Sequence, residues 1–343
     1  MAYGDSKSDV MPDITQLNAV NSLFKKAMTG AALATTNHLC KAEVIQPDLN
    51  EMFSDDKYKD VNAEILSAGG ISGIIVSGRA EDGSNFASAQ VSMQTAAMRI
   101  KQALEKISAR NKDAWNQPVV SVACLGDSVT HGCFEVFMNR FGQIDTRYRP
   151  DRGYAAQLRR RLDALYPAAA VSVLNAGVSG GNAGHGLARL ERDVLSHKPD
   201  LVIVNFALND SCGGLEKLED YRRAMAAIFD GVLASGAECM LLTPNRMCAY
   251  VAPSVKDAAL VRAAEDCSKV QNSGVLDAYV DAARALARER KIPVADAYAE
   301  WNRLERAGVD TTALLANDIN HPTEDMHGVF VEKIMDALLR GEG

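Results

Sequence analysis

The residues best placed to do chemistry begin with a serine at the end of an apolar segment. Residues Val119–Glu135 read VVSVACLGDSVTHGCFE, in which the apolar run breaks at Gly126 and Ser128 follows. A uniformly apolar run of this kind predicts a buried strand. A strand, a turn of small residues and a helix start are how α/β enzymes present a nucleophile at the carboxyl edge of a sheet. We therefore predict that the Ser128 hydroxyl is available to attack a substrate.

A serine hydroxyl is a weak nucleophile, and His321 is the histidine best placed to serve as its base. The sequence has six histidines, and His321 stands in the segment NDINHP, three residues after Asp318. At this spacing the Asp318 carboxylate can hold the imidazole Nδ1–H along a turn. Taken alone, however, a capping aspartate beside a surface histidine explains this spacing better. His131, one turn after Ser128, is a second histidine that could touch the substrate.

Donors for a developing oxyanion are predicted in two further loops. The segment NAGVSGG at 175–181 follows the second predicted strand, and glycines there let the backbone approach a substrate closely. Asn209 follows the third predicted strand and could supply a side-chain N–H. Glycine-rich loops and strand-ending Asn-Asp turns are individually unspecific. A nucleotide-binding loop is not favoured, since no G-x-G-x-x-G follows the first strand and no Walker lysine motif is present.

Strands and helices alternate along the last two-thirds of the chain and would bring these loops together. Strands are predicted at Val119–Leu125, Ala170–Leu174, Leu201–Phe206, Glu238–Leu242 and Ile292–Ala295, and amphipathic helices near Tyr154–Tyr166, Gly186–His197, Leu215–Ser235, Gly274–Arg290 and Glu324–Leu339. This order predicts an α/β fold, a three-layer, flavodoxin-like parallel sheet of five strands with helices on both faces. Ligands of such sheets bind outside the carboxyl ends of the strands, where Ser128 and the two donor loops lie.

The first third of the chain has a different pattern. Helices are predicted over residues 14–37 and 86–110, with a strand at Ile71–Val76, so we predict a mainly helical N-terminal region over residues 1–115 and a catalytic domain over 116–343. Met93, Ala97, Ile100, Leu104 and Ile107 form a short heptad-like seam. That seam could pack on its own domain or mediate a homo-oligomer, and the role of the region stays open.

Composition limits the classes of function. The 343 residues are 47% hydrophobic and 24% charged, with a formal net charge of −7, which argues against nucleic-acid binding. No apolar run approaches the roughly 20 residues of a membrane helix, and the N-terminus lacks a signal-peptide pattern. The seven cysteines include no C-x-x-C pair, so neither a disulfide framework nor a metal site is indicated and a reducing cytoplasm fits best. No cofactor is expected.

Taken together, the motifs resemble the SGNH (GDSL-type) hydrolase superfamily over about Val119–Leu339. The matching blocks are GDSVTHG at 126–132, NAGVSG at 175–180, ALND at 207–210 and DINH at 318–321. The resemblance implies a triad of Ser128, His321 and Asp318. It also implies an oxyanion hole formed by the N–H groups of Ser128 and Gly180 and the side chain of Asn209. Ala207 stands where the family commonly has glycine, which we expect to be a small change.

The resemblance also suggests a reaction. The continuation of the first block is most similar to bacterial carbohydrate-esterase members, so we expect hydrolysis of a short, acetyl-type ester of a sugar or other polar alcohol through an acyl-enzyme. A lipase or thioesterase and a non-catalytic glycan-binding module on the same fold are the alternatives. A flavodoxin-like nucleotide binder is a third. Asp127, His131, Asn175 and Asp210 are interpreted as structural or pocket-lining residues.

Overall fold

The computed structural model describes residues 43–45, 62–68, 71–77 and 102–340. The chain divides into two compact units, and each is described by itself. In the first, β1 (Glu43–Ile45), β2 (Asn62–Ala68) and β3 (Ile71–Ser77) form an antiparallel sheet in the order β1-β2-β3. The strand β3 coincides with the predicted one, whereas β1 and β2 were not predicted. The helix predicted over 14–37 and residues 86–101 of the helix predicted over 86–110 lie outside the described residues.

The second unit, residues 100–339, is built around a five-stranded sheet in the order β10-β9-β8-β4-β7. All four pairings are parallel, which confirms the predicted doubly wound sheet. The strands are β4 (Ser121–Gly126), β7 (Ser172–Gly177), β8 (Leu201–Asn205), β9 (Glu238–Leu242) and β10 (Val294–Ala295). The register sets Gly126 beside both Gly177 and Asn205, so three site loops start side by side.

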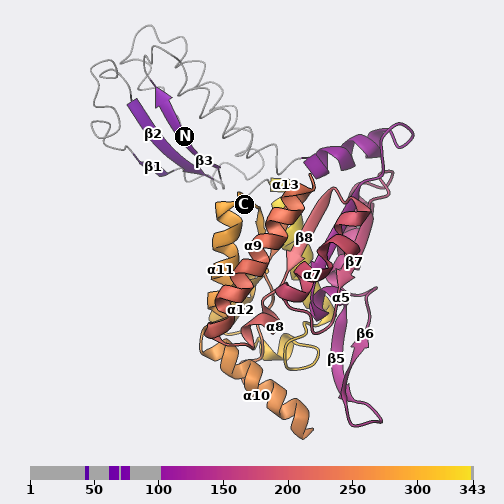
Figure 1. The fold of residues 1–343 in the computed structure, drawn as a ribbon, viewed down its shortest axis with the longest axis vertical. Coiled ribbons are helices and arrows are strands. Elements are labelled where there is room, and N and C mark those ends of the chain that lie inside the picture. Colours follow the sequence, from indigo (N-terminus) through magenta and orange to yellow (C-terminus); the bar gives the residue numbers. More distant parts are fainter. Residues whose placement is uncertain (1–42, 46–61, 69–70, 78–101, 341–343) are drawn as a thin grey trace. The chain divides into compact units, whose positions relative to one another are not determined.

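Helices cover both faces of this sheet (Figure 1). On one face α7 (Ala183–Asp193), α9 (Leu218–Ala234) and α11 (Val275–Glu289) pack in a row. α6 (Tyr154–Leu165) packs against α13 (Glu324–Arg340), where the rings of Tyr154 and Phe330 lie 5.5 Å apart, and Lys333 pairs with Glu300 of α12 (Ala297–Arg306). Further helices are α8 (Leu208–Ser211), α10 (Ala258–Asn272) and the 3-10 turns η2 (Leu195–His197), η3 (Leu215–Lys217) and η4 (Thr312–Leu314).

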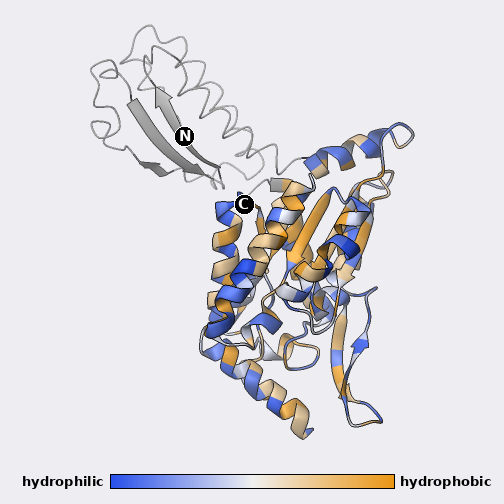
Figure 2. Cartoon of the chain, in the orientation of Figure 1, coloured by the Kyte–Doolittle hydropathy of each residue, from blue (hydrophilic) through white to orange (hydrophobic). Residues whose placement is uncertain are grey.

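Burial follows the order of the strands in the sheet. All five residues of β8 are buried, because helices cover both of its faces, whereas the edge strand β7 exposes Ser172 and Asn175. Figure 2 shows the same contrast as hydrophobic colouring concentrated along the central strands. Trp301, Tyr298 and Phe229 are among the largest fully buried side chains and fill the space between helices and sheet.

Three features differ from the sequence prediction. The helix expected after Ser128 is a single turn, α5 (Ser128–His131), which ends at Gly132 with a left-handed φ of 92°. The chain then forms the antiparallel hairpin β5 (Cys133–Met138) and β6 (Ile144–Tyr148), which extends from the carboxyl edge of the sheet (Figure 1). α10 and α12 were not predicted either.

Residues 102–112 form a helix at the amino edge of the sheet, opposite the predicted site (Figure 1). The Glu238 carboxylate, at the start of β9, accepts hydrogen bonds from the backbone N–H groups of Gln102 and Ala103. Ile107 of the predicted seam is fully buried in the core. At Ile107 the seam therefore packs in the core of the second unit, while Met93, Ala97 and Ile100 lie outside the described residues. The boundary at residue 115 stays a prediction, although this helix packs within the second unit.

Candidate active site

Ser128 and His321 meet across 193 residues of sequence. Ser128 begins α5 at the carboxyl end of β4, and His321 lies in the loop that leads into α13. The Ser128 Oγ and His321 Nε2 atoms are 3.0 Å apart, within hydrogen-bond reach. Both residues are almost fully buried, at 5% and 6% exposure. The structure thus brings together the predicted nucleophile and base.

The imidazole of His321 is held by a backbone carbonyl. Its Nδ1 lies 2.9 Å from the carbonyl oxygen of Phe134, on the first residues of β5. A carbonyl can only accept, so Nδ1 carries the proton and Nε2 presents its lone pair to the serine hydroxyl. This is the tautomer that a general base requires.

Asp318 does not make the predicted contact with His321. Its Oδ2 accepts a hydrogen bond of 2.6 Å from the Ser254 hydroxyl instead. The backbone of Asp318 is left-handed, with a φ of 55°, in a tight turn where the carboxylate is directed to Ser254. In this structure the group on Nδ1 is therefore the main chain of the unpredicted hairpin, and the triad with Asp318 stays a prediction.

Asn317, which sequence reasoning passed over, shapes the histidine loop. Its side-chain oxygen accepts from the backbone N–H groups of Ile319, Asn320 and His321, at 3.0, 2.9 and 2.9 Å. A second support comes from Asn245, whose amide donates to the Asn320 carbonyl at 2.8 Å. The sequence signal for this loop was an asparagine at the start of the NDINHP segment, since asparagine commonly closes such turns.

Burial keeps His321 neutral. Removal from water lowers its pKa to about 4, and the hydrogen bond to the Phe134 carbonyl only partly opposes this shift. Behind it, His327 of α13 is fully buried, and its ring centroid lies 5.0 Å from that of Phe134. Burial, with a smaller contribution from His321, lowers the pKa of His327 to about 3.

Asp127 supports the nucleophile turn. Its Oδ1 caps α5 by accepting the Val129 N–H at 2.9 Å, and the side chain is 1% exposed. Burial raises its pKa to about 7, and the negative charge of Asp210 adds to the increase. These contacts agree with the structural role predicted for Asp127.

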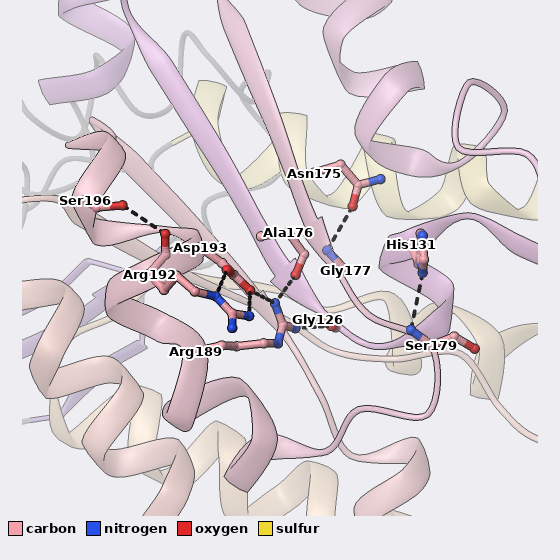
Figure 3. A network of polar contacts seen from close by, with 10 residues as sticks. All are labelled: Gly126, His131, Asn175, Ala176, Gly177, Ser179, Arg189, Arg192, Asp193 and Ser196. Carbon is pink, nitrogen blue, oxygen red and sulfur yellow. Dashed lines mark hydrogen bonds and ion pairs between the residues drawn. The ribbon is translucent and has the colours of Figure 1, made fainter.

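The loop that carries Gly180 is tied to α5 by His131. The Ser179 N–H donates to His131 Nδ1 at 3.3 Å (Figure 3). Gly177 permits this close approach, because a Cβ there would lie 2.2 Å from the backbone nitrogen of His131. Gly180 itself has a φ of 75°, in the left-handed region that glycine adopts without strain. His131 thus orients the loop of a predicted oxyanion donor.

The third loop joins the second through two hydrogen bonds. The Asn209 side-chain amide donates to the Gly181 carbonyl at 2.7 Å, which leaves its other N–H for an oxyanion. Asp210 Oδ1 accepts from Ala183, at the start of α7, at 2.9 Å. Burial raises the pKa of Asp210 to about 6, and hydrogen bonds from the N–H groups of Ala183, Asp210 and Ala207 oppose this increase.

Ala207 occupies a strained backbone position. Its φ is 137°, outside the regions open to residues with a side chain, and it is fully buried. The substitution of alanine for the usual glycine is therefore more than an added methyl group in a turn, as the sequence comparison had suggested. Backbone strain of this kind costs about 1–3 kcal/mol.

Asn175 and the unpredicted Arg189 serve the strand ends instead of the nucleophile (Figure 3). The Asn175 side chain accepts from the Gly177 N–H at 2.9 Å, as in an Asx turn. The guanidinium of Arg189, which is 7% exposed, donates to the carbonyls of Ala176 and Gly126, at 2.6 and 2.8 Å. The sequence signal that could have indicated this role was an arginine on the inner, apolar face of an amphipathic helix.

The described residues offer no clustered metal ligands: within them, no group of three or more His, Cys, Asp or Glu side chains could hold an ion. In the same part of the chain, no helix has the length and apolar character needed to cross a membrane. The site chemistry that the described side chains themselves can perform is nucleophilic attack by Ser128 with His321 as base.

The chain matches a known family and a curated relative. The GDSL-like lipase/acylhydrolase family model matches residues 124–329. An acetylxylan esterase from Geobacillus stearothermophilus is 40% identical over 70 residues, a match that covers 20% of this chain and only 29% of that relative.

The chain is also similar to solved structures. A two-domain esterase active on acetylated mannans has a TM-score of 0.50 at 19% identity, with 71% of this chain and 53% of that chain covered, a likeness that shows the fold alone. An alpha/beta hydrolase enzyme from the metagenome of Lake Arreo, Spain, has a TM-score of 0.48 at 22% identity, with 64% and 94% covered.

Proposed function

The chain belongs to the GDSL-like lipase/acylhydrolase family, and we propose that it is a serine esterase working through a Ser128–His321 dyad. The observation that carries the proposal is the 3.0 Å contact between the Ser128 hydroxyl and a buried imidazole whose proton is fixed on Nδ1. The Phe134 carbonyl takes the place that a carboxylate has in a triad. A carbonyl orients the ring and partly stabilises the imidazolium without carrying a full charge.

In the first half of the reaction, His321 Nε2 takes the proton of Ser128 as Oγ attacks the ester carbonyl. The tetrahedral oxyanion accepts hydrogen bonds from the N–H groups of Ser128 and Gly180 and from the Asn209 side chain. When the intermediate collapses, the carbon–oxygen bond to the alcohol breaks. His321 then returns its proton to the leaving alcohol, and the acyl group stays on Ser128.

In the second half, water replaces the alcohol. His321 Nε2 accepts a proton from the water as its oxygen attacks the acyl-enzyme, and the same three donors hold the second oxyanion. Collapse breaks the bond to Ser128 Oγ, which regains its proton from His321. The products are a free carboxylic acid and the original enzyme.

We propose an acetyl ester of a carbohydrate as the substrate. Support comes from the sequence likeness to an acetylxylan esterase over 70 residues, and from the low aromatic content of 6%, which does not favour a long-chain lipase. The whole relative is not covered by the match, so the substrate rests on the experiment below. A reducing, cytoplasmic setting belongs to the same proposal.

The test is acetate release from acetylated xylo-oligosaccharides, compared with release of long-chain acids from 4-nitrophenyl palmitate. We expect the acetyl esters to be cleaved much faster, and Ser128→Ala to abolish the reaction. Faster cleavage of palmitate would instead favour a lipase. Equal rates for Ser128→Ala and the wild type would contradict the esterase itself and favour a non-catalytic module.

A further inference from the structure

The β5–β6 hairpin carries a group of exposed apolar side chains next to the site. Phe137, Phe141, Ile144 and Tyr148 are all more than 40% exposed, with Tyr148 at 49%. Figure 2 shows the hydrophobic colouring that β5 carries along the projecting hairpin. Single exposed apolar residues are ordinary, so the place of each of the four along the hairpin decides whether it bears on the site.

Of these residues, Tyr148 lies at the base of the hairpin and borders the catalytic residues. Its pairing partner is Cys133, which follows α5 after one glycine, whereas Ile144 pairs with Met138 near the far end. The Tyr148 ring packs on His131, with centroids 4.8 Å apart. His131 is three residues after Ser128 on the same helical turn, so their side chains project from one face.

The histidine under this ring also contacts the loop of the predicted oxyanion donor. His131, on which Tyr148 packs, accepts the N–H of Ser179, the residue before Gly180. The Tyr148 ring is therefore connected through His131 to both the nucleophile turn and the Gly180 loop. We expect a molecule bound at Ser128 that extends past His131 to meet the exposed part of the ring.

Tyr148 is held in a fixed position before any ligand arrives. The ladder to β5 fixes its backbone, and the next residue, Arg149, donates its N–H to the Gly132 carbonyl at 2.8 Å. The Arg149 side chain pairs with Glu135 at 3.0 Å. A ring that is already ordered loses little conformational entropy when a ligand covers it.

We propose that Tyr148 is a specificity-determining residue, whose exposed ring binds the sugar unit next to the unit that carries the ester. The apolar face of a pyranose ring buries itself on an aromatic ring, and the hydroxyl groups stay in water. This inference rests on the proposed carbohydrate substrate. It adds the residue that would contact the saccharide beyond the acetylated sugar unit. A second copy of the protein is the other occupant that such a ring could bind.

The experiment compares two substrates in four proteins: the wild type, Tyr148→Ala, Tyr148→Phe and Phe141→Ala. The substrates are an acetylated xylo-oligosaccharide and 4-nitrophenyl acetate, which has no sugar. We expect Tyr148→Ala to lower the ratio of kcat/KM for the saccharide to that for the nitrophenyl ester by about tenfold, mainly through KM, as expected for one stacking contact. Tyr148→Phe keeps the ring and should restore the ratio. Phe141→Ala, on the same hairpin, should leave it unchanged.

Several outcomes would overturn the inference. If Tyr148→Ala lowers kcat/KM for both substrates equally, the ring supports the structure of the site and does not bind the sugar. If light scattering shows that the variant changes the mass of the particle, the ring packs between copies of the protein. If the wild type cleaves 4-nitrophenyl acetate but no acetylated saccharide, the carbohydrate substrate and the subsite both fail while the esterase stands.

Discussion

Replacing Asp318 with asparagine should leave most of the activity intact. In an enzyme whose aspartate holds the histidine, the same change costs on the order of 10⁴ in kcat, because the wrong tautomer results. Here Nδ1 is bonded to the Phe134 carbonyl, and the Asp318 carboxylate is bonded to Ser254. Only that hydrogen bond is weakened, so we expect kcat to fall by less than about threefold and the free energy of unfolding to fall by about 1 kcal/mol.

Asn317→Ala is the matched perturbation in the same loop. Its side-chain oxygen accepts three backbone N–H groups, at 2.9–3.0 Å, including that of His321. At about 1 kcal/mol for each bond, the loop loses about 3 kcal/mol. Displacement of the base by about 1 Å can cost on the order of 100-fold in rate. We therefore expect the alanine variant at 317 to be far less active than the asparagine variant at 318.

The assay is kcat for 4-nitrophenyl acetate at pH 8, with thermal unfolding of each variant measured in parallel. A triad in which Asp318 holds the imidazole and a dyad in which the Phe134 carbonyl holds it predict losses of kcat for Asp318→Asn that differ by more than three orders of magnitude. A loss of 1000-fold or more in kcat, with unfolding unchanged, would refute the reasoning. It would mean that Asp318 reaches the imidazole during the reaction.

Three further outcomes follow from the site. The base must be neutral, and burial lowers the pKa of His321 to about 4. We therefore expect kcat/KM to stay level as the pH falls through 6.5 and then to drop tenfold per pH unit below about 4. A break in the pH profile near 6.5 would contradict the buried environment. Asn209→Ala should lower kcat by about 100- to 1000-fold with little change in KM, and an unchanged kcat would remove Asn209 from the oxyanion hole. Ala207→Gly should raise the free energy of unfolding by at least about 1 kcal/mol in urea titrations, because glycine adopts a φ of 137° without strain; a destabilised variant would contradict that account.

Much of the fold could be predicted because its signals are local. The five parallel strands are short apolar runs separated by amphipathic helices, and each was found within a few residues of its observed bounds. The hairpin was missed since Cys133–Tyr148 mixes charged and aromatic residues without regular alternation and contains a bulge between Cys133 and Val136. α10 and α12 were missed although each begins after an aspartate that caps it, Asp257 and Asp296, a signal that the sequence prediction did not use.

The sequence by itself determined which side chains could react. The serine, the histidine and the asparagine of the family blocks are tied to particular residue types at particular strand ends, so Ser128, His321 and Asn209 could be named from the order of motifs. Glycine at 177 and 180 follows the same logic, because close approach and positive φ exclude other residues. Side-chain chemistry is visible in a sequence.

Only the tertiary structure decided what holds the base. The group on His321 Nδ1 is a main-chain carbonyl, which every residue possesses and no motif can mark. Its position depends on a hairpin that begins five residues after Ser128 and returns to a loop almost two hundred residues away. Asp318, at a suggestive spacing, is turned to Ser254 by a left-handed backbone. Spacing along the chain limits which groups can meet, but the packing of distant segments selects the pair that does.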